Sequence, residues 1–280
     1  MVIVSMKELL IDAEKNGSAV GAFSVGNMEM VMGVINAAEE TETPVILQIA
    51  EKRLMNSPLE LMAPMMVNAA KEAKVKIAVH LDHGLTLDCI KKALSYGFTS
   101  VMLDCSLKPL PENIALTKEV VALAEKYSAT VEAELGVVGG NEGDTEEHII
   151  TCTDPKVAKH FCKETGIDAL AVAIGNAHGN YPVLPELRFD VLEEIYNQTD
   201  IPLVLHGGTG ITDEMFRKAI SLGIRKINIA TASFDALTRF SQEYLNSSAS
   251  ADYFTLSSRM VQGVYENVKK HIEIFSIKEN

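Results

Sequence analysis

Short apolar runs alternate with longer amphipathic segments along nearly the whole chain of 280 residues. Eight of these runs read as strands, and a segment with helical periodicity follows each of them. The runs are almost continuous in Val, Ile, Leu and Ala, which is typical of parallel strands covered on both faces. They are residues 20–25, 45–49, 77–82, 100–104, 130–135, 169–174, 202–206 and 226–230.

Eight strand–helix units in roughly 250 residues favour a closed α/β architecture, the (β/α)8 or TIM barrel. An open doubly wound sheet is the alternative, but a composition that stays even along the chain favours closure. Residues 253–275 predict one extra C-terminal helix after the barrel. The sequence has no visible linker or low-complexity run, so we expect residues 1–280 to form a single domain.

Charge and composition argue against several kinds of partner. The net charge is −13 with no basic block, which argues against nucleic acid or an anionic membrane surface as partner. No apolar run approaches the roughly 18–20 residues of a membrane span, and the N-terminus lacks the features of an export signal. The four cysteines form no C-x-x-C pair, as is usual for reduced thiols. We therefore expect a cytoplasmic protein.

Polar side chains end nearly every predicted strand, whereas the opposite ends carry mainly turn residues and lysine. In a TIM barrel the C-terminal ends of the strands and the loops after them carry the chemistry. This bias predicts an active site at that end of the barrel. The residues concerned are Gln48, Asp82, His83, Asp104, Glu134, His178, His206 and Asn228.

Three histidines follow three different strands, and each precedes a glycine: His83, His178 and His206. A His–Gly step lets the backbone turn sharply while the imidazole faces the barrel mouth. Three neutral imidazoles with an open fourth position are what a catalytic zinc site requires. The alternative is that each is an unrelated core histidine.

The other four histidines have less distinctive positions. His80 should point the same way as Asp82, and we expect it to support the site rather than bind metal. We expect His148, His160 and His271 to be solvated surface residues.

Two glycine-containing or polar segments, "HGGTG" (206–210) and "NIAT" (228–231), each lead into a predicted helix. Backbone N–H groups at helix starts bind phosphate, and the loops after strands seven and eight are the recurrent phosphate site of TIM barrels. The two segments therefore predict a phosphate-binding site next to His206.

Six motifs carry the most specific signal: "HLDHG" (80–84), "VMLDCS" (101–106), "EAELGVVGG" (132–140), "AVAIGNAHGNY" (171–181), "PLVLHGGTGI" (202–211) and "KINIAT" (226–231). Together they resemble the class II, metal-dependent ketose-bisphosphate aldolases, in particular the fructose- and tagatose-bisphosphate aldolases. The resemblance runs from about Gly21 to the C-terminus. It implies a zinc-dependent carbon–carbon lyase that reversibly cleaves a ketose 1,6-bisphosphate to dihydroxyacetone phosphate and an aldehyde such as glyceraldehyde 3-phosphate.

The resemblance also implies roles for particular residues. His83, His178 and His206 match zinc ligands, and Asp104 and Glu134 match carboxylates for a second or displaced metal. Asp82 matches the acid/base on the aldehyde-side oxygen, and Glu142 the loop group that moves the proton at carbon. Dihydroxyacetone phosphate, often with a monovalent cation (Na⁺ or K⁺) nearby, would be held by Gly179, Gly207, Gly208, Thr209, Asn228, Ile229, Ala230 and Thr231.

The family suggests a homodimer or homotetramer. Arg259 is a candidate for binding a distal phosphate or carboxylate, including across a subunit interface, with a solvated helix arginine as the alternative. The chain departs from the family pattern in three places, all at the predicted substrate mouth: "FSVGN" (23–27), Ala50 in place of a frequent serine, and Pro182 after Tyr181. Fructose, tagatose and other ketose 1-phosphates therefore stay open as substrates.

Three rival mechanisms are less consistent with the residues. A Schiff-base aldolase would need a lysine at the end of strand six, and Lys226 is predicted to begin strand eight, at the wrong end. A metal-dependent hydrolase barrel commonly has an H-x-H near its first strand. A non-catalytic companion subunit of an aldolase would be expected to lose ligands, whereas this chain retains them.

Overall fold

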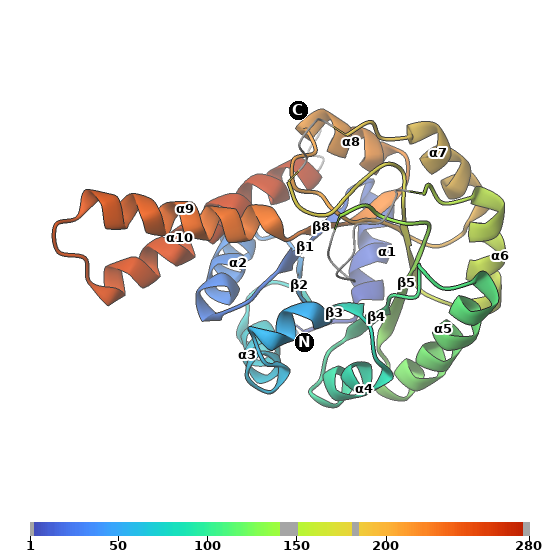
Figure 1. Cartoon of the computed structure of the whole chain (residues 1–280), viewed down its shortest axis with the longest axis horizontal. Helices are drawn as coiled ribbons and strands as arrows, with labels where there is room; N and C mark the ends of the chain where they lie inside the picture. Colours follow the sequence, from blue (N-terminus) through green and yellow to red (C-terminus); the bar gives the residue numbers. More distant parts are fainter. Residues whose placement is uncertain (1–2, 141–150, 181–184, 277–280) are drawn as a thin grey trace.

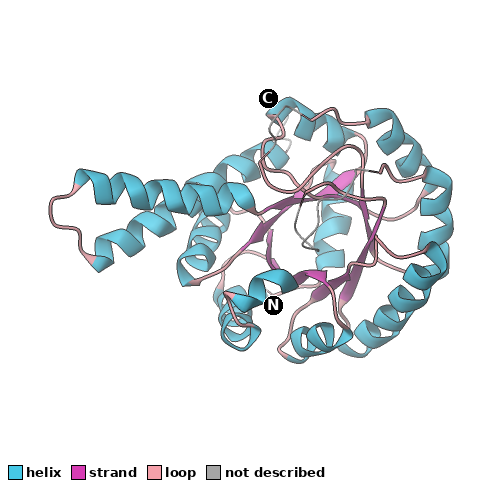
Figure 2. Ribbon diagram, in the orientation of Figure 1, coloured by secondary structure: helices cyan, strands magenta, loops and turns pink. Residues whose placement is uncertain are grey.

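A computed structural model describes residues 3–140, 151–180 and 185–276 of the chain. Its eight parallel strands close into a barrel in the order β1 to β8, with β8 paired to β1 (Figures 1 and 2). The strands are β1 Val20–Ser24, β2 Val45–Ala50, β3 Ile77–Gly84, β4 Ser100–Leu103, β5 Thr130–Leu135, β6 Ala169–Val172, β7 Leu203–Leu205 and β8 Ile224–Ile229. The predicted (β/α)8 barrel is confirmed.

Helices surround the barrel, one after each strand, and two further helices fall outside this repeat (Figure 2). The helices are α1 Met6–Asn16, α2 Met28–Glu40, α3 Leu59–Glu72, α4 Leu87–Ser95, α5 Leu110–Ala124, α6 Pro155–Thr165, α7 Phe189–Gln198, α8 Asp213–Ser221, α9 Thr231–Ser247 and α10 Tyr253–Phe275. The extra C-terminal helix, α10, has the predicted bounds. The helix α1 before the first strand was not predicted.

Helix α1 closes the N-terminal end of the barrel, and Figure 1 shows it across the ring of strands. Ser5 begins the helix by accepting a hydrogen bond from the Glu8 N–H at 3.2 Å, and Gly17 ends it at a φ of 61°. Leu9 and Leu10 of α1 pack inside the strand ring with small residues such as Ala78, in a cluster separate from the larger core between strands and helices.

Helices α9 and α10 form an antiparallel pair, and α10 packs on both α9 and α2. The end of α9 and the start of α10, with the turn at 248–252 between them, project away from the barrel, and we call this part the arm (Figure 1). Large apolar side chains on the arm are exposed, namely Leu245, Tyr253 and Phe254. No helix in the described ranges has the length and apolar character needed to cross a membrane.

The start of β8 differs from the prediction in a way that matters for the site. The strand begins at Ile224, so Lys226 lies within it rather than at its start. The Lys226 side chain is 0% exposed and lies inside the barrel, where its Nζ is 2.9 Å from Glu132 Oε2. This lysine therefore belongs to the barrel interior and not to the rim at the N-terminal end.

Candidate active site

Strand β3 delivers two neighbouring residues, Asp82 and His83, to the same site, although adjacent strand residues normally face opposite sides of a sheet. At His83 the backbone takes a φ of 41°, and the pairing of β3 with β4 shifts register between Leu81 and Gly84. A left-handed residue costs roughly 1–2 kcal/mol. A Cβ at Gly84 would collide with the Met102 carbonyl oxygen. In this strand the histidine itself makes the turn, and glycine provides the space behind it.

His178 and His206 come from the loop after β6 and the end of β7. The backbone N–H of His178 donates to the Gly139 carbonyl at 2.7 Å, which ties the loop after β6 to the loop after β5. Gly179 and Gly207 follow the two histidines with φ of 86° and 65°, where a side chain would be strained. At these two positions the His–Gly steps turn as the sequence predicts.

The structure brings the three imidazoles together. Their ring centroids are separated by 4.9, 4.6 and 5.8 Å, and each ring offers a nitrogen within 4.8 Å of the others. Ligand nitrogens around a tetrahedral zinc ion are roughly 3.3 Å apart, from Zn–N distances of roughly 2.0–2.1 Å. The Nε2 of His178 is buried and has no hydrogen-bond partner among the described residues. This donor set therefore fits a divalent metal ion.

Burial and neighbouring charges together set the pKa values of the three rings. Burial and the charge of His83 hold the pKa values of His178 and His206 well below the usual value. Burial alone would also lower the pKa of His83, but Asp82 and a hydrogen bond to Asp104 raise it to about 10. The Nε2 of His83 lies 2.9 Å from His206 Nδ1. Without a metal, His83 therefore carries a proton at the point where the rings meet.

Two carboxylates, Asp104 and Glu134, lie beside the rings, and Glu134 Oε2 is 3.4 Å from His206 Nδ1. The Oδ2 of Asp104 is 2.8 Å from His83 Nδ1. Burial alone would raise the pKa of Asp104, but the hydrogen bond and charge of His83 outweigh it and hold that pKa below its usual value. Burial and the charge of Asp104 raise the pKa of Glu134 well above its usual value. His83, Asp104 and Glu134 form a second set of atoms that could hold a metal.

Asp82 is held at both carboxylate oxygens inside the barrel mouth. Its Oδ1 accepts from Asn228 Nδ2 at 3.0 Å, and its Oδ2 accepts from Gln48 Nε2 at 3.0 Å. Gln48 also donates to Ser24 at 3.1 Å, so three other strands fix the position of one carboxylate. The sequence pattern placed Gln48 at a strand end without giving it this function.

A small pocket joins the metal-binding rings to the predicted phosphate segments. It is lined by Gln48, Asp82, His178, Gly179, Gly207, Gly208, Thr209, Asn228, Ala230 and Thr231. Helix α9 begins at Thr231, and its Ala232 N–H donates to the Thr209 side chain at 3.1 Å. The N-terminus of a 17-residue helix therefore lies at this pocket, where it favours an anion.

Two residues predicted to bind substrate lie elsewhere. The Ile229 side chain is fully buried in the core between strands and helices, so only its backbone is available to a ligand. Arg259 is exposed on α10 and does not line the pocket. Glu142 lies outside the described residues.

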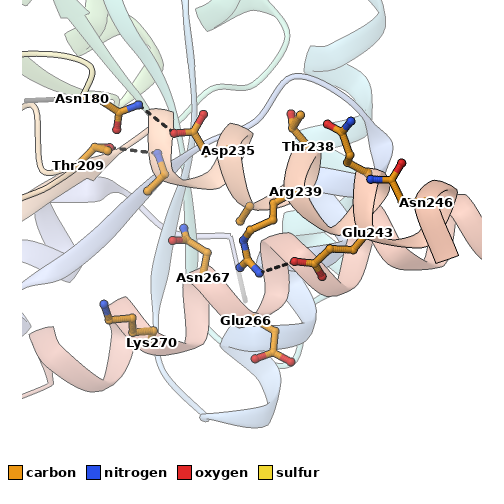
Figure 3. A pocket seen from close by; sticks show the side chains of 13 residues that line it. Asn180, Thr209, Asp235, Thr238, Arg239, Glu243, Asn246, Glu266, Asn267 and Lys270 are labelled. Atoms are coloured by element: carbon orange, nitrogen blue, oxygen red, sulfur yellow. Dashed lines mark hydrogen bonds and ion pairs between the residues drawn. The ribbon is translucent and has the colours of Figure 1, made fainter.

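A second, larger cavity of about 910 Å³ lies between the phosphate segments and the base of the arm (Figure 3). It shares Thr209 with the small pocket, and none of the three converging histidines lines it. Figure 3 shows Asn180, from the loop after β6, directed at Asp235 of α9, with Nδ2 3.1 Å from Oδ2. The larger cavity is therefore a neighbour of the site rather than the site itself.

The remaining histidines follow the prediction only in part. His80 is buried, with Nδ1 2.8 Å from Ser100 Oγ, and does not belong to the three-ring cluster. His160 is exposed, as expected. The prediction for His271 was wrong: it is 7% exposed and packs edge-on against Phe216, because α8 covers that face of α10. His148 lies outside the described residues.

The comparisons with known proteins agree with this geometry. Residues 4–280 match the family described as fructose-bisphosphate aldolase class-II. A fructose-bisphosphate aldolase of Staphylococcus aureus is 44% identical over 250 residues, covering 88% of this chain and 87% of that protein. A fructose-bisphosphate aldolase of Geobacillus stearothermophilus is 43% identical over 254 residues, covering 88% and 86%.

A solved structure gives the same result for the fold. The crystal structure of the YdjI aldolase from Escherichia coli K12 superposes with a TM-score of 0.87 at 36% identity, covering 98% of this chain and 97% of that chain. The range matched by the family includes all three converging histidines. The chain belongs to the class II fructose-bisphosphate aldolase family, and it is accordingly a carbon–carbon lyase.

Proposed function

We propose that the protein reversibly cleaves a ketose 1,6-bisphosphate, of the fructose or tagatose type, to dihydroxyacetone phosphate and an aldehyde such as glyceraldehyde 3-phosphate. The observation that carries this proposal is the meeting of His83, His178 and His206 beside one pocket that also contains Asp82 and the glycine-rich segments. The whole chain, residues 1–280, works as one domain in this proposal.

The three imidazoles would hold one Zn²⁺ ion, and Asp104 and Glu134 would offer a second or displaced position. When bound, such an ion supplies a Lewis acid that polarises the ketone and withdraws electrons from the carbon–carbon bond that breaks. Neutral imidazoles leave the full charge of the ion available, and the low pKa values of His178 and His206 keep both rings neutral.

Asp82 handles the proton of the hydroxyl group that becomes the aldehyde. The donors Gln48 and Asn228 hold its carboxylate in one orientation, as a positioned general base needs. Glu142 is proposed to take and return the proton at carbon.

The phosphate of dihydroxyacetone phosphate would bind to Gly179, to residues 207–209 and to residues 228–231. The support is the start of α9 at this pocket and the glycine backbone that lets a ligand approach closely. Holding the phosphate fixes the ketone relative to the metal-binding rings, which lowers the entropic part of the barrier. A monovalent cation nearby, Na⁺ or K⁺, stays a prediction, tested by measuring cleavage with each ion in turn.

The experiment is zinc analysis of the purified protein followed by cleavage assays on a panel of ketose 1-phosphates and 1,6-bisphosphates. We expect one zinc per chain and release of dihydroxyacetone phosphate from at least one member, with loss of activity after chelation. Activity that survives complete removal of metal would contradict the proposal. Cleavage only of a ketose 1-phosphate without a distal phosphate would keep the chemistry and change the substrate.

We also propose that the protein is a homodimer or homotetramer whose subunits meet through the arm. The support is the exposed Leu245, Tyr253 and Phe254 on a helical pair that extends beyond the barrel. Light scattering on the native protein and on Phe254→Ser tests this, since a smaller assembly is expected only in the variant. We place the protein in the cytoplasm, because its four cysteines are free thiols.

A further inference from the structure

Lys226 is a buried cation at the centre of the barrel, directly beneath the candidate site. Its side chain is 0% exposed, and a buried ammonium is unfavourable unless it is paired and hydrogen-bonded. Its Nζ lies 2.9 Å from Glu132 Oε2 and donates to Asn228 Oδ1 at 2.7 Å. Glu132 contacts the metal-binding His206, and Asn228 contacts Asp82. Lys226 is therefore linked to the metal-binding rings through one partner and to the proton-transfer carboxylate through the other.

The first link leads to the metal-binding rings. The second oxygen of Glu132, Oε1, lies 2.8 Å from His206 Nε2. An ionised carboxylate only accepts hydrogen bonds, so the proton of His206 must lie on Nε2. The Nδ1 of His206, which faces His83 at 2.9 Å, is then the nitrogen with the free electron pair. Glu132 therefore fixes which nitrogen can bind a metal, and Lys226 holds Glu132.

The second link leads to the proton-transfer carboxylate. An ammonium group has donors and no acceptor, so it requires the oxygen of the Asn228 amide to face it. The amide NH₂ must then point the opposite way, and it donates to Asp82 Oδ1 at 3.0 Å. The Asp82 carboxylate, which only accepts, favours the same orientation, so Asp82 and Lys226 hold the Asn228 amide from its two ends. Without the ammonium, the amide keeps only one of these two contacts.

We propose that Lys226 is a positioning residue for the aldol reaction, which aligns the metal-binding His206 through Glu132 and the proton-carrying Asp82 through Asn228. This inference rests on the proposed function. Lys226 does not contact the substrate in this proposal. Its buried positive charge orients His206 and Asp82 through their neighbours Glu132 and Asn228. The lysine thus has a function quite different from that of a Schiff-base lysine.

The first test is Lys226→Met, which keeps an unbranched side chain of similar length but removes the charge and the donors. We expect zinc affinity, measured by competition with a chromogenic chelator, to fall about 10–100-fold, as for other residues that support metal ligands. We expect kcat to fall at least as much and KM to change less than kcat, because the phosphate contacts of Gly179 and residues 207–209 do not depend on Lys226. Lys76→Met is the matched control, since Lys76 is a half-exposed surface lysine paired with Glu8 and Asp12.

A second variant tests the link to His206 separately from the link to Asp82, and it avoids leaving an unpaired buried carboxylate that could unfold the protein. Lys226→Met combined with Glu132→Gln leaves no uncompensated charge in the barrel, and the side-chain carbonyl of the new amide can still accept from His206. We expect zinc affinity to recover several-fold relative to Lys226→Met. We expect kcat to stay low, because the Asn228 amide still lacks the cation that orients it.

The outcomes distinguish this inference from simpler explanations. Unchanged zinc affinity and kcat in folded Lys226→Met would overturn it, and so would complete recovery of kcat in the double variant. Failure of the double variant to fold would show that Lys226 serves folding alone and would also contradict the inference. If the unaltered protein binds no zinc, the proposed function fails, and the inference fails with it.

Discussion

The two ends of the barrel interior use the same eight strands for opposite purposes. At the N-terminal end the inward side chains are apolar, such as Ala22, Ile46 and Val204, and α1 closes the opening with Leu9 and Leu10. At the C-terminal end the same faces of the same strands carry Gln48, Asp82, His206 and Asn228. Side chains two residues further along a strand point the same way, so the change happens within one or two residue pairs.

This difference shows how the fold separates stability from chemistry. The apolar end contributes burial, whereas the mouth contains desolvated carboxylates, a left-handed histidine and rings that crowd one another. Such features lower stability and are retained where function needs them. Substitutions at one end should therefore leave the property provided by the other end unchanged.

The largest effect is expected at the mouth, in Asp82→Ala. The loss of a positioned acid/base should lower kcat roughly 10²–10⁴-fold. Zinc content should not change, because Asp82 is not one of the three ring ligands. Steady-state kinetics and metal analysis on the same preparation test this. Full activity in the variant would remove Asp82 from the mechanism.

A free-energy change of comparable size is expected at the closed end, in Leu10→Ala, but there it should lower stability and leave kcat unchanged. The Leu10 side chain is 0% exposed, and truncating a buried leucine destabilises a protein by roughly 2–5 kcal/mol. Urea unfolding measures the loss, and kcat of the folded enzyme should stay unchanged. Ile11→Ala on the same helix is the control, since Ile11 is 42% exposed and should cost less than about 0.5 kcal/mol. A large fall in kcat for Leu10→Ala would show that the two ends are coupled.

His271 sharpens the comparison, because it is a buried histidine far from the mouth. Burial lowers its pKa from 6.5 to about 4. Between pH 6.5 and 4 the unfolded chain therefore binds more protons than the folded protein, so stability is full above pH 6.5 and is lost as the pH falls toward 4. The shift corresponds to at most about 3 kcal/mol.

Unfolding midpoints at several pH values measure this contribution as a difference between variants. His271→Leu should remove part of the acid-induced loss of stability. His160→Leu, at an exposed position on another helix, is the control for the loss of a histidine as such. Identical pH profiles for the unaltered protein and His271→Leu would show that this ring does not titrate as its environment requires.

Much of the fold followed from local pattern. The eight apolar runs predicted the strands, because a strand covered on both faces must be apolar at nearly every position. The convergence of His83, His178 and His206 also followed, since the ends of parallel strands in a barrel meet at one opening. Chain order and periodicity carry both kinds of information.

What the sequence did not reveal depends on partners far apart along the chain. Lys226 looked like a strand-starting lysine, and only Glu132, on a strand across the barrel, shows why it is buried. His271 was predicted to be solvated, because the helical periodicity of the sequence does not show that α8 covers its face of α10. The sequence pattern attributed the turn at His83 to the following glycine. The left-handed angle lies at His83 itself, because it depends on how β4 pairs with β3. Each of these is a tertiary contact.

The central claim is that three imidazoles bind one divalent ion, and zinc K-edge X-ray absorption on the purified, zinc-loaded protein tests it most directly. We predict one zinc per chain, with the scattering of three imidazole rings and Zn–N distances of roughly 2.0–2.1 Å. A first shell of sulfur, or of oxygen atoms with one imidazole or none, would contradict the account.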